Sequence, residues 1–494
     1  MSYQRLHSLF ERSSLLGQTQ AVLGWDMQAV MPAGGAEARG LQLAELSAIR
    51  AELFANPEIA DWFEHAGADT DLGDGERVNM REMRREWLQR TAIEPSLAKE
   101  LTRAGAECFG VWKDARKDND FNKLLPYFEK VLGLTRQVAA LTGERLGLSP
   151  YNALLDQFTP GATEESVEAA FAPLKARLPD LLQRVLDAQA SRPTPKPLNG
   201  PFPTSKQREL GEKLMSVVGF DFDHGRLDES LHPFCGGVPS DVRITTRYSE
   251  GDFLQGLMGV LHETGHAMYE RQLPKEWSSQ PRGSARGMAM HESQSLLIEM
   301  QVCRSPEFIR YAAPLMRETF GGSGDAWEPE NLIAHYHKVE RGLIRVDADE
   351  VSYPLHVILR FDIERDLISG KLAPRDLPEV WRTKMNEMVG VEPPTDSDGC
   401  MQDIHWMDGA YGYFPAYSLG AIAANQLYSA ACEQVDGLRG DIERGEFAGL
   451  MAWLKKNVHS IASAETADEI LTRATGRTFD SDAYLTHLES RYIG

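Results

Sequence analysis

Two histidines and a glutamate in the segment His262-Glu263-Thr264-Gly265-His266 have the types and spacing of a catalytic metal site. Histidines four residues apart lie one turn apart on a helix, so both imidazoles leave the same face. Their nitrogens can then reach one ion at about 2.0–2.1 Å. Glu263 lies beside them, where its carboxylate can accept a proton from an attacking water. Chance would place this H-E-x-x-H pattern in roughly 3% of chains of this length, so metal-assisted hydrolysis is the leading interpretation.

A catalytic zinc ion usually has three protein ligands and an open fourth position. The next clear helix begins at His291 and continues past Glu299. Glu292 or Glu299 could supply a carboxylate, and His291 could supply an imidazole. Spacing alone does not decide among these three residues.

The histidine pair requires a helix, and the surrounding sequence predicts one that begins near Phe253. Asp252 can cap its first turn, and Gln255 has the spacing of a capping box. Apolar residues then recur at helical spacing, and Pro274 ends the helix or follows its end closely.

A strand over residues 241–248 is predicted immediately before this helix. Val242 and Ile244 share one face of it, while Arg243 and Thr245 share the other, and the β-branched content favours a strand. Three glycines on the following helix would let a neighbouring segment approach it closely: Gly256, Gly259 and Gly265.

Helical periodicity dominates the rest of the chain, both before residue 190 and from Phe253 to the end. Five prolines between residues 192 and 204 predict an extended connector. We expect one large, mainly helical domain over residues 1–494, with a subdomain boundary near 192–204. The connector could equally be a long surface loop across that domain.

The chain has 494 residues and a formal net charge of -21, from 73 acidic and 52 basic residues. Such a surface repels phosphate backbones and anionic lipids, so we expect neither nucleic acid nor membrane as a partner. Five scattered cysteines indicate no disulfide framework. The N-terminal residues lack the apolar run of a signal peptide, and no stretch is apolar enough to span a membrane. We expect a cytoplasmic protein.

Six motifs follow one another along the chain: His232-Pro233-Phe234, Asp241-Val242-Arg243-Ile244-Thr245, His262-Glu263-Thr264-Gly265-His266, His291-Glu292-Ser293-Gln294-Ser295, Ile344-Arg345 with Ala348-Asp349-Glu350, and Gly399-Cys400-Met401-Gln402-Asp403-Ile404-His405-Trp406. Trp25-Asp26 and Met31-Pro32 precede them. In this order, and over nearly the whole chain, they resemble the carboxypeptidase Taq family of zinc metallocarboxypeptidases.

The resemblance implies a gluzincin-like fold that is almost wholly helical, with a small sheet along a deep active-site groove. It implies that Glu292 is the third metal ligand after His262 and His266, with one zinc ion per chain and cobalt as a working substitute. It also implies a homodimer that removes single residues from peptide C-termini, with broad specificity and poor activity at proline.

A hydrolase of this kind needs hydrogen-bond donors for the tetrahedral oxyanion. His405 is the leading candidate and Tyr417 the second, in a stretch that also contains Tyr411 and Tyr413. Packing in the groove wall is the alternative role for each tyrosine.

An exopeptidase must also recognise a free carboxylate, and the fork of an arginine matches its two oxygens. Arg345 and Arg243 are the candidates. Arg345 could instead form a structural ion pair with a nearby acidic residue: Asp347, Asp349 or Glu350. The resemblance places the Arg243 motif at the groove and associates His232 with closing one end of it.

Two other functions are compatible with a metal site of this kind. An oligopeptidase that cuts internal bonds of short peptides would share the metal ligands and the groove. A binding protein with a decayed site is disfavoured, because the full set of His262, Glu263, His266 and Glu292 is present.

Overall fold

The computed structural model describes every residue from Met1 to Gly494, and most of them lie in α-helices. The helices are α1 Ser2–Ala29, α2 Ala36–Phe54, α3 Ile59–Gly67, α4 Asp74–Arg90, α5 Pro95–Asp118, α6 Phe121–Leu146, α7 Pro150–Phe158, α8 Glu164–Ala190, α9 Thr204–Val218, α10 Leu254–Gln272, α11 Gly287–Leu296, α12 Pro306–Phe320, α13 Pro329–Tyr336, α14 Tyr353–Ser369, α15 Leu377–Met388, α16 Pro415–Gln434, α17 Leu438–Glu443, α18 Ala448–Leu454, α19 Ala467–Thr475 and α20 Ser481–Tyr492. The mainly helical fold expected from the sequence is therefore confirmed.

The sheet has three short strands, β1 Gly225–Glu229, β2 Phe234–Val238 and β3 Asp241–Thr246, in the order β1-β3-β2. β1 runs parallel to β3, while β2 runs antiparallel to it. β3 is the strand that the alternating pattern predicts. Its side chains Val242 and Ile244 are buried and pack with Val260 of α10, so the sheet rests on the helix that carries the histidine pair.

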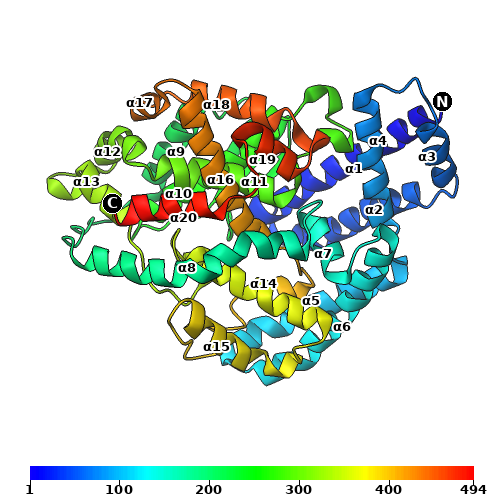
Figure 1. Ribbon diagram of the computed structural model, residues 1–494, viewed down its shortest axis with the longest axis horizontal. Coiled ribbons are helices and arrows are strands. Elements are labelled where there is room, and N and C mark those ends of the chain that lie inside the picture. The colour runs from blue at the N-terminus through cyan, green and yellow to red at the C-terminus, as the bar shows by residue number, and fades with distance from the viewer.

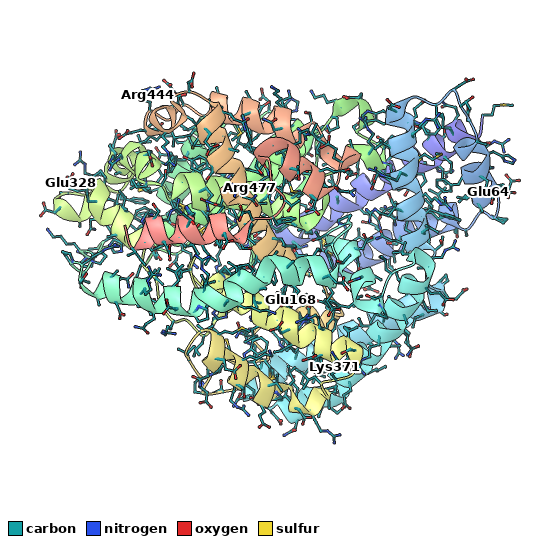
Figure 2. All side chains as sticks on the ribbon, in the orientation of Figure 1. Glu64, Glu168, Glu328, Lys371, Arg444 and Arg477 are labelled. Carbon is teal, nitrogen blue, oxygen red and sulfur yellow. The ribbon has the colours of Figure 1, made fainter.

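The N-terminal helices α1–α4 gather at one end of the molecule (Figure 1) and enclose a small core of their own. The proline-rich residues 192–203 contain no helix or strand and link α8 to α9. Charged side chains such as Glu64, Glu328 and Lys371 extend from the surface (Figure 2). None of the helices combines the length and the apolar character that crossing a bilayer demands.

Two larger hydrophobic cores meet at α11 and α16. The first contains buried side chains of α5–α8, α14, α15 and α20, and the second those of α9, α10, α12, α13 and α17–α19. On α11 the cores divide between Ala289 and Met290, and on α16 between Ile422 and Ala423. Because interiors are close-packed, the residues that these two helices carry are held from both sides.

Helix α10 begins at Leu254, one residue after the predicted start, and ends close to Pro274 as expected. The Asp252 carboxylate accepts a hydrogen bond from the Leu254 backbone N–H at 2.8 Å, which satisfies one of the free donors of the first turn. The capping box expected with Gln255 does not form. The helix ends at Gln272, two residues before Pro274.

Gly265 lies where α10 and α11 are in close contact beside the histidine pair. A Cβ atom here would lie 2.5 Å from the Gln294 carbonyl oxygen and 2.6 Å from the Ser295 Cα, so the expected close approach is confirmed. Gly256 lies against the Arg247 carbonyl oxygen, at 3.4 Å from its ideal Cβ. The same expectation was wrong for Gly259, which has no neighbouring atom within 4 Å because its side of α10 is open.

Gly265→Ala should destabilise the protein by about 1–3 kcal/mol, since backbone atoms of α11 cannot move away cheaply. Gly259→Ala is the matched control on the same helix. It meets no neighbour and should leave stability unchanged or raise it by up to about 1 kcal/mol. Thermal unfolding of both variants measures the difference, and equal melting temperatures would contradict the close-approach argument.

Candidate metal centre

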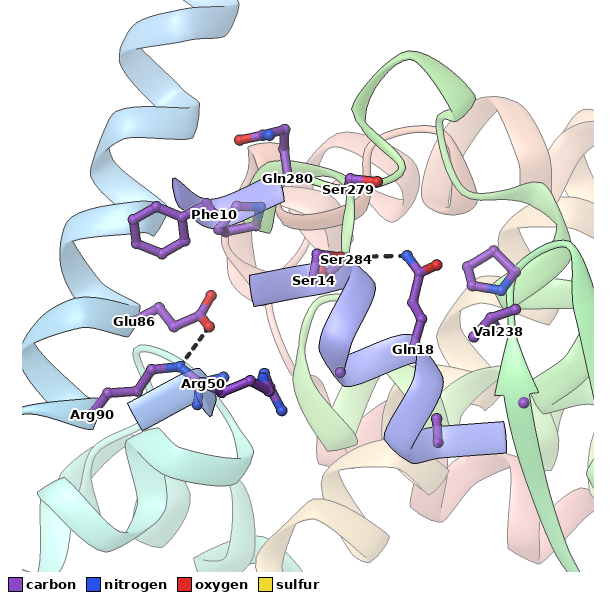
Figure 3. A pocket seen from close by; sticks show the side chains of 15 residues that line it. Phe10, Ser14, Gln18, Arg50, Glu86, Arg90, Val238, Ser279, Gln280 and Ser284 are labelled. Atoms are coloured by element: carbon purple, nitrogen blue, oxygen red, sulfur yellow. Dashed lines mark hydrogen bonds and ion pairs between the residues drawn. The ribbon is translucent and has the colours of Figure 1, made fainter. Parts of the chain in front are cut away.

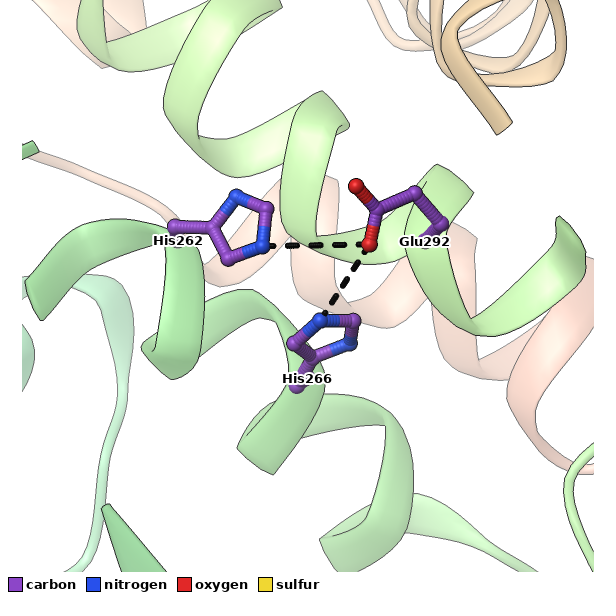
Figure 4. Close-up of side chains that lie close together, drawn as sticks. All are labelled: His262, His266 and Glu292. Carbon is purple, nitrogen blue, oxygen red and sulfur yellow. Dashed lines mark ion pairs between the residues drawn. The ribbon is translucent and has the colours of Figure 1, made fainter. Parts of the chain in front are cut away.

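His262, His266 and Glu292 converge on one point between α10 and α11 (Figure 4). The Glu292 Oε2 lies 3.4 Å from the His266 Nε2 and 3.8 Å from the His262 Nε2, and all three ligand atoms lie within 4.8 Å of one another. Tetrahedral zinc with bonds near 2.0–2.2 Å separates its ligand atoms by roughly 3.3–3.5 Å. The donor set therefore fits a divalent ion, and Glu292 is the one of the three third-ligand candidates that joins it.

Glu299 lies behind His262 and orients it. It belongs to a π-helical segment, Leu297–Cys303, that continues α11, a geometry often found at functional sites. Its carboxylate accepts a hydrogen bond from the His262 Nδ1 at 2.8 Å and pairs with Arg304 at 2.5 Å. Because Nδ1 carries the proton, the lone pair of Nε2 faces the Glu292 carboxylate.

His291 performs the corresponding task for His266. Its Nε2 lies 2.8 Å from the Glu270 carboxylate, and its Nδ1 lies 2.6 Å from the His266 Nδ1. The carboxylate accepts, so the His291 Nε2 donates and its Nδ1 accepts from His266. This chain again leaves the Nε2 of His266 as the free lone pair.

The electrostatics of this interior favour a bound cation. Burial alone would raise the pKa of Glu292, but His262 and His266 hold that pKa at about 2. Burial opposes protonation of His262, whereas Glu292 and Glu299 raise its pKa to about 10, so a bound ion would take the place of the proton on its Nε2. These carboxylates thus stabilise positive charge in a poorly solvated space, and they would stabilise a divalent ion in the same way.

Glu263 is buried beside these residues, with 7% of its surface exposed. Burial raises its pKa to about 7, with His262 opposing the shift and Glu292 adding to it. A carboxylate with a pKa near the working pH can both accept and return a proton. The residue adjacent to the first histidine thus has the properties of a general base.

Aromatic residues that follow the His405 motif form a wall of packed rings, close enough to Glu292 for its charge to act on Tyr413 and Tyr417. The rings of His405 and Tyr413 lie 5.5 Å apart, and those of Tyr413 and Tyr417 lie 5.3 Å apart. Burial lowers the pKa of His405 to about 4, with Asp403 opposing the shift. Burial raises the pKa of Tyr417 well above its usual value, and Glu292 adds to this. Near pH 7 both side chains are therefore neutral and can donate hydrogen bonds.

Arg345 is 5% exposed and lies in a buried charge network. Its Nη2 pairs with the Asp403 Oδ1 at 2.8 Å, and its Nη1 donates to the Tyr353 hydroxyl at 2.8 Å. Arg360, which is fully buried, pairs with the other Asp403 oxygen at 2.6 Å. The two guanidinium groups thus share one carboxylate, so the cluster of Arg345, Arg360 and Asp403 has a net positive charge.

The acidic partners expected for Arg345 from the sequence were wrong. Asp349 accepts hydrogen bonds from the residues that lead into α14, and Glu350 pairs with the C-terminal helix α20. Asp347 forms no ion pair with Arg345. The partner is Asp403, 58 residues away, and the only sequence signal for it is its place in the motif that contains His405.

Arg243 and His232, the other two candidates for substrate binding, lie in the sheet region. Neither contacts Arg345. Arg243 pairs with Asp241, with its Nη2 2.6 Å from a carboxylate oxygen, and its guanidinium lies 4.8 Å from the Trp25 ring centre. His232 is exposed in the turn between β1 and β2. The structure thus separates the arginine near the aromatic wall from the one on the sheet.

A mainly helical fold, a histidine pair on one helix, a glutamate from the next and a buried acid beside them define a helical metallopeptidase. The model of the carboxypeptidase Taq (M32) metallopeptidase family matches residues 5–492, and the chain belongs to this family. It is therefore a metallocarboxypeptidase that requires a divalent metal.

Similar proteins match over their full lengths. Thermostable carboxypeptidase 1 of Thermus thermophilus is 37% identical, over 99% of this chain and 98% of its own. The structure of metallocarboxypeptidase 1 of Trypanosoma cruzi is 39% identical, with a TM-score of 0.97 over 100% of this chain and 99% of its own. The M32 carboxypeptidase of Deinococcus radiodurans is 34% identical, with a TM-score of 0.93 over 99% and 98%.

His291→Ala should weaken metal binding by about 10- to 100-fold, because it removes the acceptor that fixes the tautomer of His266. A chelator competition titration of the purified protein measures this without relying on turnover. His65→Ala, at an exposed position of α3, is the matched control and should bind metal normally. Unchanged affinity in the His291 variant would refute the orienting role.

Proposed function

We propose that this metallocarboxypeptidase releases single amino acids from the free C-termini of peptides, with broad specificity and poor activity at proline. One zinc ion per chain would be held by His262, His266 and Glu292, and cobalt would substitute for it. The convergence of these three side chains beside buried Glu263 is the observation that carries the proposal. The family resemblance further supports a homodimer that acts in the cytoplasm.

The zinc ion, when bound, would polarise the scissile carbonyl and lower the pKa of the attacking water. Glu263 takes the proton of that water and later delivers it to the leaving amine. Burial raises the pKa of this carboxylate, which favours its taking up the proton. His405 and Tyr417, both neutral near pH 7, donate hydrogen bonds to the developing oxyanion.

Arg345 is the stronger candidate for the substrate carboxylate. Asp403 holds its guanidinium in place, and Arg360 supplies a second positive charge behind that carboxylate, so the group can accept an anion. Arg243 is already matched by the adjacent Asp241. We assign Arg243 and His232 to the sheet end of the groove, where they would limit the peptide.

Glu263→Gln keeps the shape of the side chain and removes the base. Turnover should fall by at least about 100-fold, while metal content measured by elemental analysis stays near one ion per chain. Glu433→Gln, at an exposed position of α16, controls for the loss of an acidic residue. A Glu263 variant with a near-normal kcat would assign the proton transfer to another group.

Arg345→Ala should lower kcat/KM for free-acid peptides by roughly 10- to 100-fold, since charged hydrogen bonds contribute about 1.5–3 kcal/mol each. The small residual rate on C-terminally amidated peptides should hardly change. Arg345→Lys should recover only part of the loss, because a point charge lacks the fork. Mass spectrometry of the products identifies the cleaved bond.

Arg243→Ala is the matched comparison. It should change kcat/KM by a more similar factor for free-acid and for C-terminally amidated peptides. A purely structural role of Arg345 within the Asp403 network predicts a different pattern, in which the melting temperature falls and both rates decrease alike. Equal rates of the unaltered enzyme on free and amidated peptides, with internal fragments as products, would favour an oligopeptidase.

A further inference from the structure

A polar cavity of about 370 Å³ lies apart from the metal centre, and none of the proposed catalytic residues lines it. Its walls come from α1, α2 and α4, from the end of β2 and the turn that follows it, and from residues 279–284 (Figure 3). Only three of its 15 lining residues are hydrophobic. A cavity with this lining suits a charged or strongly polar ligand better than an apolar one.

Arg50 supplies an unmatched positive charge to this cavity. Its Nη1 donates to the Gln20 side-chain oxygen at 2.8 Å, while its buried Nε has no hydrogen-bond partner. The neighbouring Arg90 is already paired with Glu86 at 2.7 Å. Two guanidinium groups therefore face one carboxylate.

The local packing leaves room for the Arg50 side chain in this position. A Cβ atom at Gly17 would lie 3.1 Å from the guanidinium carbon, so the glycine leaves the space that the group occupies. Partial burial and the nearby Arg90 lower the pKa of Arg50. A half-buried arginine without a carboxylate partner carries a charge that an anion would balance.

We propose that this cavity binds a small oxyanion, a carboxylate or a phosphate, through Arg50. The Ser14 hydroxyl and the Gln18 amide line the same cavity (Figure 3). The amide donates one hydrogen bond to the hydroxyl at 3.4 Å, which leaves its second N–H and the Ser14 O–H as neutral donors. The bound anion would contact α1 and α2 together with residues 279–284, which lead into α11 and therefore into Glu292. It would connect the N-terminal helices to the segment that positions the metal centre.

Isothermal titration of the metal-loaded protein with sodium phosphate, and separately with sodium succinate, tests this at constant ionic strength. Arg50→Gln should weaken binding by about 10- to 100-fold, as expected for the loss of charged hydrogen bonds. Arg12→Gln removes an equal charge from an exposed position of α1 and should bind like the unaltered protein. Binding of only one of the two anions identifies the oxyanion class.

Arg345→Ala distinguishes this cavity from the proposed carboxylate site, because it should retain binding here. Arg50→Lys, which keeps the charge, should recover part of the affinity and guards against a variant that simply misfolds. Anion binding of equal strength in the Arg50→Gln, Arg50→Lys and unaltered proteins, or no binding of either anion, would overturn the proposal.

Discussion

The approach of three helix backbones around Glu292 is the constraint on which the site depends. Gly265 lets α10 come into contact with α11, and Gly420 lets α16 come into contact with it from another direction. A Cβ at Gly420 would lie 2.7 Å from the Glu292 Cβ. Larger side chains would separate these helices, and separations of a few tenths of an ångström decide whether three ligand atoms can share one ion.

Placing several ionisable groups in this poorly solvated space is costly unless each has a partner. The structure meets this requirement in pairs that extend outward from the metal centre. Glu299 links His262 to Arg304, and His291 links His266 to Glu270. These outer residues select the imidazole tautomers, so the same contacts that make burial tolerable also direct the free lone pairs inward.

The network around Asp403 also gives each buried ionisable group a partner, but here positive charge is in excess. Helix α14 is buried around most of its circumference, and its Arg360 therefore needs a carboxylate that another segment must supply. Asp403 fills this need and also holds Arg345 near the aromatic wall. Helix α16 contacts both groups, since its Tyr417 ring lies 5.1 Å from the Arg345 guanidinium and its Gly420 lies against Glu292, and this fixes their relation to each other.

The sequence by itself determined the features that depend on neighbouring residues: the helix of His262 and His266, its Asp252 cap, its end before Pro274, and strand β3. The order of its motifs also indicated the family and singled out Glu292, which spacing could not separate from His291 and Glu299. Only the tertiary structure decided that Asp403 rather than Asp349 pairs with Arg345, that His291 supports His266, and that Gly265 but not Gly259 is a contact. Periodicity describes a single helix, whereas these choices depend on how distant helices pack against one another.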